Sequence, residues 1–413
     1  MRLCLDRGRQ RPDRGRPAPQ AGAGGQDRRG DLGRGLIATR RGRFRPRPLR
    51  AASSRCPTKS PECSGFGPNW RRNFRRPSIF PPEFVARLGR MTRIHSIDYL
   101  KFLVATGVVW AHAVLLSGHF HVPTYLFGQG LVRNAVPVFA MISGFLLHAT
   151  HRKGRTARWL TVLGCAYLFW CLVYLPIWLD GSHMSMPDLI YQLIFGPIHL
   201  WYMAALVVAV AMVMTVLRFA PSEIAAQRWL AGSALVLLLT GNAIQSVDFY
   251  TSIDMPLNSY RNGAFVEYPF VAMGYLLAGV IRKKGLDWLP RAPVLWLILA
   301  GLAVLRLIEA AFSLHYAGLS PAAPPELPPL AVAFCVTLLL AMMRTPLPAP
   351  RAPLGMISMF VYFLHYIVIL SALSVGIGNV WALTVIGVLV PTMATYALIW
   401  TLGFIRPLLQ SDR

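Results

Sequence analysis

Residues 99–117, YLKFLVATGVVWAHAVLLS, decide the fold class of this chain. This apolar run has the length that an α-helix needs to cross the hydrocarbon core of a bilayer. Its basic side chains are Lys101 near the start and His112 in the second half. The run therefore predicts a membrane-spanning helix that carries two unusual polar groups.

Similar apolar runs follow it through the rest of the chain. Lipid-exposed backbone must satisfy its own hydrogen bonds, so runs of this length predict helices. We expect an all-α polytopic membrane bundle of about ten transmembrane helices, at about residues 99–117, 130–149, 159–179, 199–218, 229–248, 263–281, 293–312, 328–343, 355–375 and 380–404.

The overall composition agrees with a membrane protein. Of the 413 residues, 54% are hydrophobic and 14% are charged, and the mean hydropathy is +0.46. Soluble proteins carry about 25% charged residues, so an ordinary soluble enzyme is excluded.

The loops between the runs predict the orientation of the bundle. Basic residues follow the second, fourth, sixth, eighth and tenth runs, whereas the loops at 180–198, 249–262 and 313–327 hold acidic residues and a single arginine, Arg261. Basic loops stay on the cytoplasmic side. Both termini are therefore predicted to be cytoplasmic.

Residues 1–90 form a separate compositional regime, rich in Arg, Gly, Pro and Ala. They hold 23 of the 42 Lys and Arg residues and 6 of the 17 Asp and Glu residues. Such a segment cannot bury enough apolar surface to fold, so a disordered basic tail is expected. A tail that binds anionic lipid or nucleic acid is one interpretation; we favour a misassigned start, with Met91 as the true initiator and residues 91–413 as the membrane domain.

Metal and nucleic-acid partners are not expected. The six cysteines form no CxxC pair and have no zinc-ligand spacing. The formal charge of +25 is concentrated in the tail, for which a misassigned start is favoured, and in loops of the predicted cytoplasmic side, where the positive-inside rule explains it.

The first run carries the strongest candidate site. Lys101 and His112 lie eleven residues apart, which on an α-helix is about 20° from the same face and about 16 Å along the axis. Asp98 can pair with Lys101 at i, i+3. Ionisable groups at membrane depth indicate function, although Lys101 snorkelling to the headgroups and His112 bonding another helix are structural alternatives.

Other polar residues are weaker candidates individually. Arg155 and Arg158 form an RxxR pair suited to phosphates, but such loops are general in membrane proteins. Arg306 and Glu309 are expected to neutralise each other. Each remaining residue has a structural explanation, and together they indicate a polar cavity: Arg133, Ser143, His199, Glu267 and His365.

In this order the motifs resemble the acyltransferase 3 family of membrane acyltransferases, over about residues 93–406. The resemblance rests on SIDYLK (96–101) leading to His112, FAMISGFLL (139–147), the Arg155 and Arg158 pair, HLWYM (199–203) and residues 357–365. It implies that Lys101 and His112 are essential and that Arg155 and Arg158 bind the donor. Lys101 often corresponds to arginine in the family, and lysine lacks the planar fork for bidentate phosphate contact.

The resemblance also implies a function. Family members commonly move an acyl group, often acetyl, from cytoplasmic acyl-CoA to a hydroxyl of an extracytoplasmic or lipid-linked glycan. Here acyl-CoA is a co-substrate and no bound cofactor is expected; the location implied is the bacterial inner (plasma) membrane. His112 is either a general base or a transient acyl carrier. The alternatives are a transporter or flippase lined by the same residues, and an inactive membrane scaffold.

Overall fold

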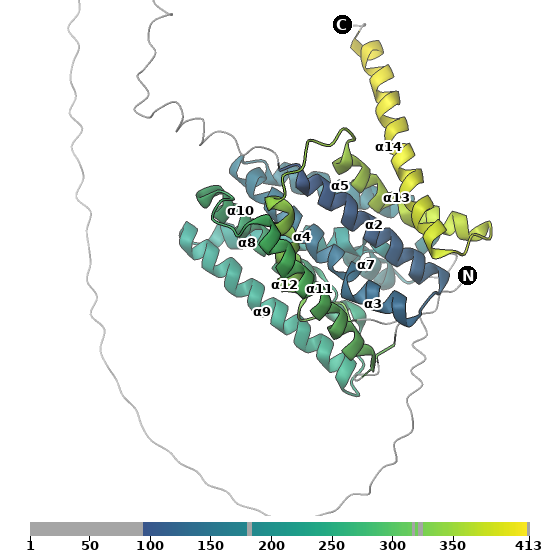
Figure 1. The fold of residues 1–413 in the computed structure, drawn as a ribbon. Coiled ribbons are helices and arrows are strands. Elements are labelled where there is room, and N and C mark those ends of the chain that lie inside the picture. The colour runs from purple at the N-terminus through teal and green to yellow at the C-terminus, as the bar shows by residue number, and fades with distance from the viewer. Residues whose placement is uncertain (1–93, 180–183, 316–318, 321–324, 411–413) are drawn as a thin grey trace, which may run out of the picture. The chain divides into compact units, whose positions relative to one another are not determined.

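The computed structural model describes residues 94–179, 184–315, 319–320 and 325–410. The predicted tail at residues 1–90 and the predicted start at Met91 lie outside this part of the chain. Within it the chain folds into helices and turns, without strands. The predicted all-α polytopic bundle is confirmed (Figure 1).

The helices follow one another with short connections. The α-helices are α2 (Ser96–Ser117), α3 (Val122–Gly130), α4 (Ala135–Arg152), α5 (Thr156–Val173), α6 (Leu175–Trp178), α7 (Met186–Phe195), α8 (Trp201–Phe219), α9 (Glu223–Tyr250), α10 (Tyr268–Lys284), α11 (Ala292–His315), α12 (Ala331–Arg344), α13 (Leu354–Ser374) and α14 (Val380–Gln410). Short 3₁₀ turns are η2 (Val132–Asn134), η3 (Ile198–Leu200) and η4 (Leu257–Ser259), and η5 (Gly263–Glu267) is a π-helical turn.

Nine helical segments of the described chain are long and apolar enough to cross a membrane. They correspond to nine of the ten predicted runs. The remaining run, the eighth at 328–343, forms the shorter α12, which begins only at Ala331. Pro328 and Pro329 explain the difference, because proline lacks the N–H that a helix interior needs. Fourteen residues rise about 21 Å, less than the roughly 30 Å hydrocarbon core.

Contacts between helix ends define two ends of the bundle. At one end Lys283 of α10 pairs with Glu223 of α9 at 2.7 Å, and Arg344 of α12 pairs with Asp287 at 3.2 Å. We call this the basic end, because it also carries Arg152 and Lys284 at the termini of α4 and α10. The opposite end, here called the far end, holds the loops around Arg261 and Glu326. The positive-inside rule predicts that the basic end is cytoplasmic.

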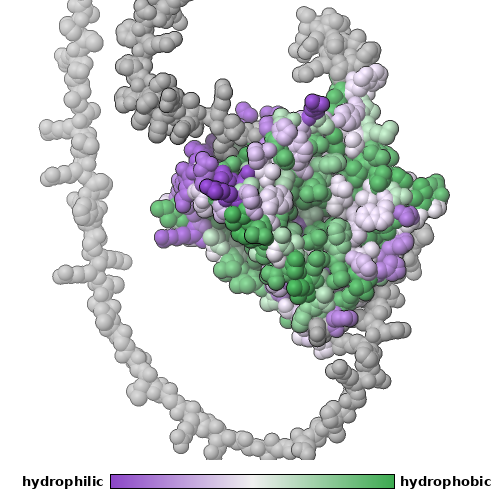
Figure 2. Space-filling model, in the orientation of Figure 1, coloured by the Kyte–Doolittle hydropathy of each residue, from purple (hydrophilic) through white to green (hydrophobic). Residues whose placement is uncertain are grey.

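Many large apolar side chains remain exposed on the outside of the bundle. Leu172 is 67% exposed, Leu297 74% and Met393 69%. Figure 2 shows apolar side chains over the middle of one face and hydrophilic ones gathered mainly towards its margins. A surface of this kind fits contact with lipid rather than with water.

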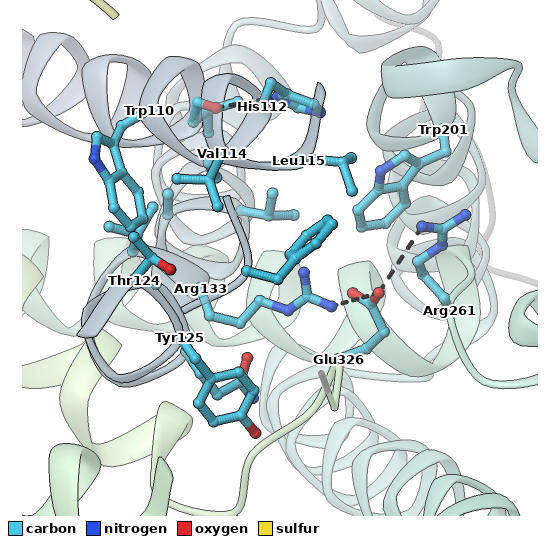
Figure 3. Close-up of a pocket in the computed structure, with 18 residues that line it drawn as sticks. Trp110, His112, Val114, Leu115, Thr124, Tyr125, Arg133, Trp201, Arg261 and Glu326 are labelled. Carbon is cyan, nitrogen blue, oxygen red and sulfur yellow. Dashed lines mark hydrogen bonds and ion pairs between the residues drawn. The ribbon is translucent and has the colours of Figure 1, made fainter. Parts of the chain in front are cut away.

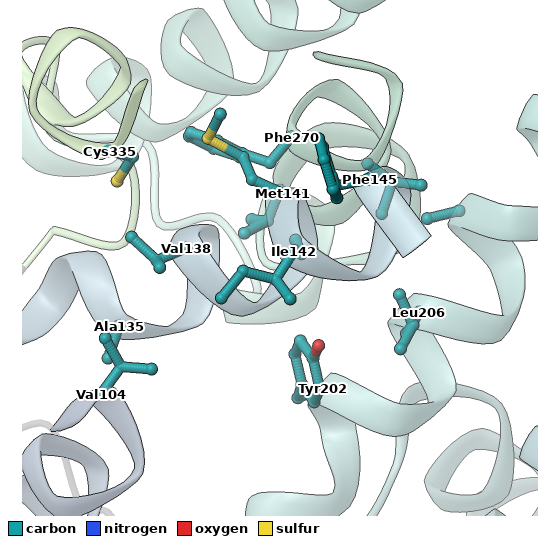
Figure 4. Close-up of a cluster of buried hydrophobic side chains, with 14 of the residues drawn as sticks. Val104, Ala135, Val138, Met141, Ile142, Phe145, Tyr202, Leu206, Phe270 and Cys335 are labelled. Atoms are coloured by element: carbon teal, nitrogen blue, oxygen red, sulfur yellow. The ribbon is translucent and has the colours of Figure 1, made fainter. Parts of the chain in front are cut away.

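The core is closest packed where α4 crosses α10. A Cβ atom on Gly144 would lie 1.9 Å from the Val271 carbonyl oxygen, and one on Gly274 would lie 2.0 Å from the Met141 carbonyl oxygen. Only glycine permits this approach on both sides. Met141, Phe145 and Phe270 fill the core beside the crossing, and Leu206 of α8 belongs to the same cluster (Figure 4). This core fixes α4 relative to α2 and α8, the helices that carry the candidate site.

Candidate functional site

His112 of α2 and His365 of α13 contact each other directly. The Nδ1 atom of His112 lies 3.1 Å from Nε2 of His365 and 3.0 Å from the Val108 carbonyl oxygen. The Nδ1 atom of His365 lies 2.9 Å from the Val361 carbonyl oxygen. The structure thus brings together two predicted site residues that are 253 positions apart.

These contacts assign the neutral tautomers of both rings. A carbonyl oxygen only accepts, so Nδ1 of His112 and Nδ1 of His365 each carry a hydrogen and donate it. Nε2 of His365 is then the acceptor for His112. The remaining lone pair of His112 lies on Nε2, which bonds no described residue. An imidazole held in this way presents a base or nucleophile to its surroundings.

The ring of His112 lies at the wall of a cavity of about 220 Å³. The wall is built mainly by α2 and α3, with Trp201 of α8 and the far-end residues Arg261 and Glu326 closing it (Figure 3). The cavity therefore combines an apolar wall with a few polar groups, which is typical of small-molecule sites.

Three charged side chains meet in this cavity. Arg133 forms an ion pair with Oε1 of Glu326, and Nη1 of Arg261 lies 3.8 Å from the same oxygen (Figure 3). Their exposed side-chain fractions are 27%, 24% and 10% for Arg133, Arg261 and Glu326. The Arg261 guanidinium also lies 5.0 Å from the centre of the Trp201 ring. The sequence allowed the Arg133 side chain to extend to the lipid headgroups. In the structure it lines the cavity and pairs with Glu326.

Burial affects the pKa of Arg261 but not its charge. It lowers the pKa of the guanidinium from its ordinary value, and the Glu326 carboxylate opposes this shift. Arginine begins with a pKa above 12 and stays protonated. The cavity therefore contains two permanent positive charges and one carboxylate.

The segment that carries Glu326 is held by side chains of other helices. Oε1 of Gln245 accepts from the backbone N–H groups of Glu326 and Leu327 at 2.7 and 2.8 Å, and Nε2 of Gln245 donates to the Leu327 carbonyl at 3.0 Å. Gln129 donates to the Pro325 carbonyl at 2.8 Å. Irregular backbone inside a membrane bundle needs such partners, and they fix the position of the Glu326 carboxylate.

Behind Gln129 lies a buried ion pair between Arg306 and Glu309 of α11, as the i, i+3 spacing predicts. The Arg306 side chain is fully buried and also donates to the Gln129 carbonyl. This pair therefore stabilises the wall of the cavity from outside it.

His199 completes a cluster of three histidines. Its ring centre lies 5.1 Å from that of His365 and 6.2 Å from that of His112, and the ring stacks on Tyr366 with an interplanar angle of 11°. Ile198, next to it, has a φ of +54°. A β-branched residue rarely adopts this conformation, and strain of this kind marks functional positions. Both ring nitrogens of His199 are buried and bond no described residue.

Glu267 and Ser143 lie away from this cavity wall. The Glu267 side chain is fully buried at the end of η5, and neither carboxyl oxygen bonds a described residue. Ser143 lies 3.4 Å from the Tyr202 hydroxyl. The roles of both residues stay predictions.

Lys101 lies towards the other end of α2. Its ammonium group is 3.6 Å from Asp98, as predicted, and the Asp98 side chain is 8% exposed. Arg155 and Arg158 are exposed at the start of α5. A common donor site of these two arginines with Lys101 stays a prediction.

Sequence reasoning missed the cluster of Arg133, Arg261 and Glu326 as a unit. From the sequence, Arg261 and Glu326 are only charged residues of the loops at 249–262 and 313–327. An arginine in an otherwise acidic set of loops was the signal that could have found it.

Comparison with known proteins gives a family match over most of the chain. The family model described as an acyltransferase domain, of the acyltransferase 3 family, matches residues 94–402. A serine/alanine racemase from Enterococcus gallinarum is 26% identical over 211 residues, which are 46% of this chain and 30% of that protein. An amino-acid racemase from Enterococcus faecalis is 27% identical over 205 residues, 46% of this chain and 28% of that protein.

The matched part thus spans less than a third of the length of either racemase. No solved structure gives a significant match.

Proposed function

This chain belongs to the acyltransferase 3 family, and on that premise we propose that it moves an acyl group from a cytoplasmic acyl-CoA to a hydroxyl of an extracytoplasmic or lipid-linked glycan. Acetyl is the group we expect. The observation that carries the proposal is the free Nε2 lone pair of His112 at the wall of a cavity near the far end. The family match supports a multi-pass membrane acyltransferase; the donor, the acceptor and the bacterial inner membrane are part of the proposal.

The chemistry requires a base at the acceptor hydroxyl. In one route, Nε2 of His112 removes the hydroxyl proton as the oxygen attacks the thioester carbonyl, and the C–S bond breaks to release CoA. In the other, Nε2 attacks the thioester carbonyl and the C–S bond breaks to release CoA; the acceptor oxygen then attacks the acyl group, the N–C bond breaks, and the freed Nε2 takes the hydroxyl proton. Both routes need the same lone pair, and His365 supports both because it holds the opposite edge of the ring.

The donor phosphates are proposed to bind at the basic end. Lys101 lies on the same helix as His112, about 16 Å nearer the predicted cytoplasmic side. Arg155 and Arg158 add exposed guanidinium groups at that end, and guanidinium groups bind phosphate well. On this arrangement the nucleotide stays cytoplasmic while the acyl end extends towards His112.

Surface glycans provide the cellular test. We expect mass spectrometry of glycans from a deletion strain to lack species heavier by one acetyl group, and complementation with the wild-type gene to restore them. Complementation with the His112→Ala variant at equal abundance is expected to fail. Identical glycan spectra in the deletion and complemented strains would count against this acceptor class.

A transporter is the rival function class. The two related racemases are named for amino acids, so an amino acid is the first solute to test. Uptake of labelled serine that depends on this gene, with unchanged glycan acetylation, would favour transport over transfer.

A further inference from the structure

The cavity beside His112 carries a surplus of positive charge. Among the residues that line it, Arg133, Arg261 and Glu326 are the charged ones. Two guanidinium groups share one carboxylate oxygen, so one positive charge is left unbalanced. A partly buried charge without an equal counter-charge is costly unless a ligand supplies it.

The same wall also holds polar atoms whose hydrogen bonds are not made. Four buried atoms bond no described residue: the Tyr125 hydroxyl, Oε1 of Gln129, Nε of Arg261 and Nε1 of Trp110. All four residues line the cavity. These atoms have almost no accessible surface, so they make the wall more polar but do not themselves contact a ligand in the cavity.

The size of the cavity limits that ligand. Its volume is about 220 Å³, below the roughly 300–1,000 Å³ of pockets for drug-sized ligands. The part of a glycan that it encloses is therefore small.

We propose that the acceptor carries an anionic group, a carboxylate or a phosphate, which Arg133 and Arg261 bind while the hydroxyl to be acylated faces His112. This inference rests on the proposed function, because it names the chemical class of that acceptor. A planar guanidinium binds either anion through paired hydrogen bonds. Glu326 sets the spacing of the two arginines and lowers the net charge to one.

The cluster is positioned before any ligand arrives. Arg133 donates from Nε to the Pro325 carbonyl at 3.2 Å, and Gln245 holds the backbone of Glu326. Arg261 lies against Trp201. Binding an anion therefore costs little ordering of side chains, which favours affinity.

Binding of small probes to the purified full-length chain tests this inference. We would compare methyl β-D-glucuronide, glucose 1-phosphate and the neutral methyl β-D-glucoside by isothermal titration. We expect at least one anionic probe to bind about tenfold more tightly than the glucoside, since hydrogen bonds to charged groups are the stronger ones. The better anion identifies the source as a uronic acid or a phosphate.

Variants locate the effect in the cluster. Arg261→Gln should abolish the preference for the anion, whereas Glu326→Gln should increase it because the competing carboxylate is gone. Arg344→Gln, which removes a comparable ion pair at the basic end, should leave the preference unchanged. Arg133→Lys keeps the positive charge and should keep part of the preference for the anion. It is the control for variants whose loss of charge could cause misfolding.

Equal affinity for all three probes, no binding of either anion at millimolar concentration, or a preference unchanged in both Arg261→Gln and Glu326→Gln would overturn the inference. His112→Ala separates it from the proposed function, because this variant should still prefer the anion. If the wild-type chain keeps the preference but transfers no acyl group, the proposed function fails and the binding site stands. If the wild-type chain acylates the neutral glucoside as fast as the anionic probes, the proposed function stands and the inference of an anionic acceptor fails.

Discussion

Replacing His112 with alanine is expected to lower the rate of acyl transfer by at least about 10²-fold, the usual contribution of a general base. The substitution removes an imidazole that lines the cavity and whose Nε2 bonds no described residue. It leaves the helix intact, since alanine is the best helix former. Initial rates at saturating acyl-CoA, measured in purified membranes and normalised to the amount of protein, check this prediction.

A second histidine variant provides the matched control. His148 lies in α4, with its ring 5.0 Å from that of Tyr275 and away from the residues that line the cavity. His148→Ala is expected to keep the wild-type rate. A wild-type rate in His112→Ala would mean that this histidine only joins α2 to α13 through His365.

Replacing Lys101 with alanine is expected to raise the KM for acyl-CoA about tenfold, as the loss of one charge-assisted hydrogen bond predicts. The kcat at saturating donor should change much less, because Lys101 lies about 16 Å along the helix from His112. Donor titrations in the same membranes separate the two parameters.

Two further variants test the reason for that change. Lys101→Arg keeps the charge and should retain most of the affinity for the donor, whereas Lys101→Ala also removes the ion pair between Lys101 and Asp98. Protein abundance must therefore be measured for both. The double change Arg155→Ala and Arg158→Ala should raise the KM in the same direction. A KM that stays constant in all three variants would remove the basic end from the donor site.

Much of the fold could be predicted because each apolar run is a local property. Hydropathy located nine helical segments, with ends that differ from the predicted runs by up to eight residues, and the i, i+3 spacing gave the pairs of Asp98 with Lys101 and Arg306 with Glu309. The error at α12 was also local. Its apolar run includes Pro328 and Pro329, which count as apolar but delay the start of the helix.

The site could be predicted only in part because its contacts join distant segments. Helical periodicity places His112 and His365 on the faces of their own helices, but it says nothing about which faces meet. Glu326 comes from an irregular segment, and its position depends on Gln245 of α9. The lone arginine among the acidic loops marks Arg261, but no spacing in the sequence relates Arg261 or Glu326 to Arg133, so only the structure shows that the three charges meet.

The most direct test of the account is the sidedness of the reaction. The purified chain would be reconstituted in liposomes with its basic end inside, acetyl-CoA would be enclosed, and an acceptor sugar would be added outside. We predict that acetyl ester appears outside in the same molar amount as free CoA thiol appears inside, and that neither appears with His112→Ala. Release of CoA without external ester, or ester formation equal in wild-type and His112→Ala liposomes, would contradict transfer through the cavity at His112.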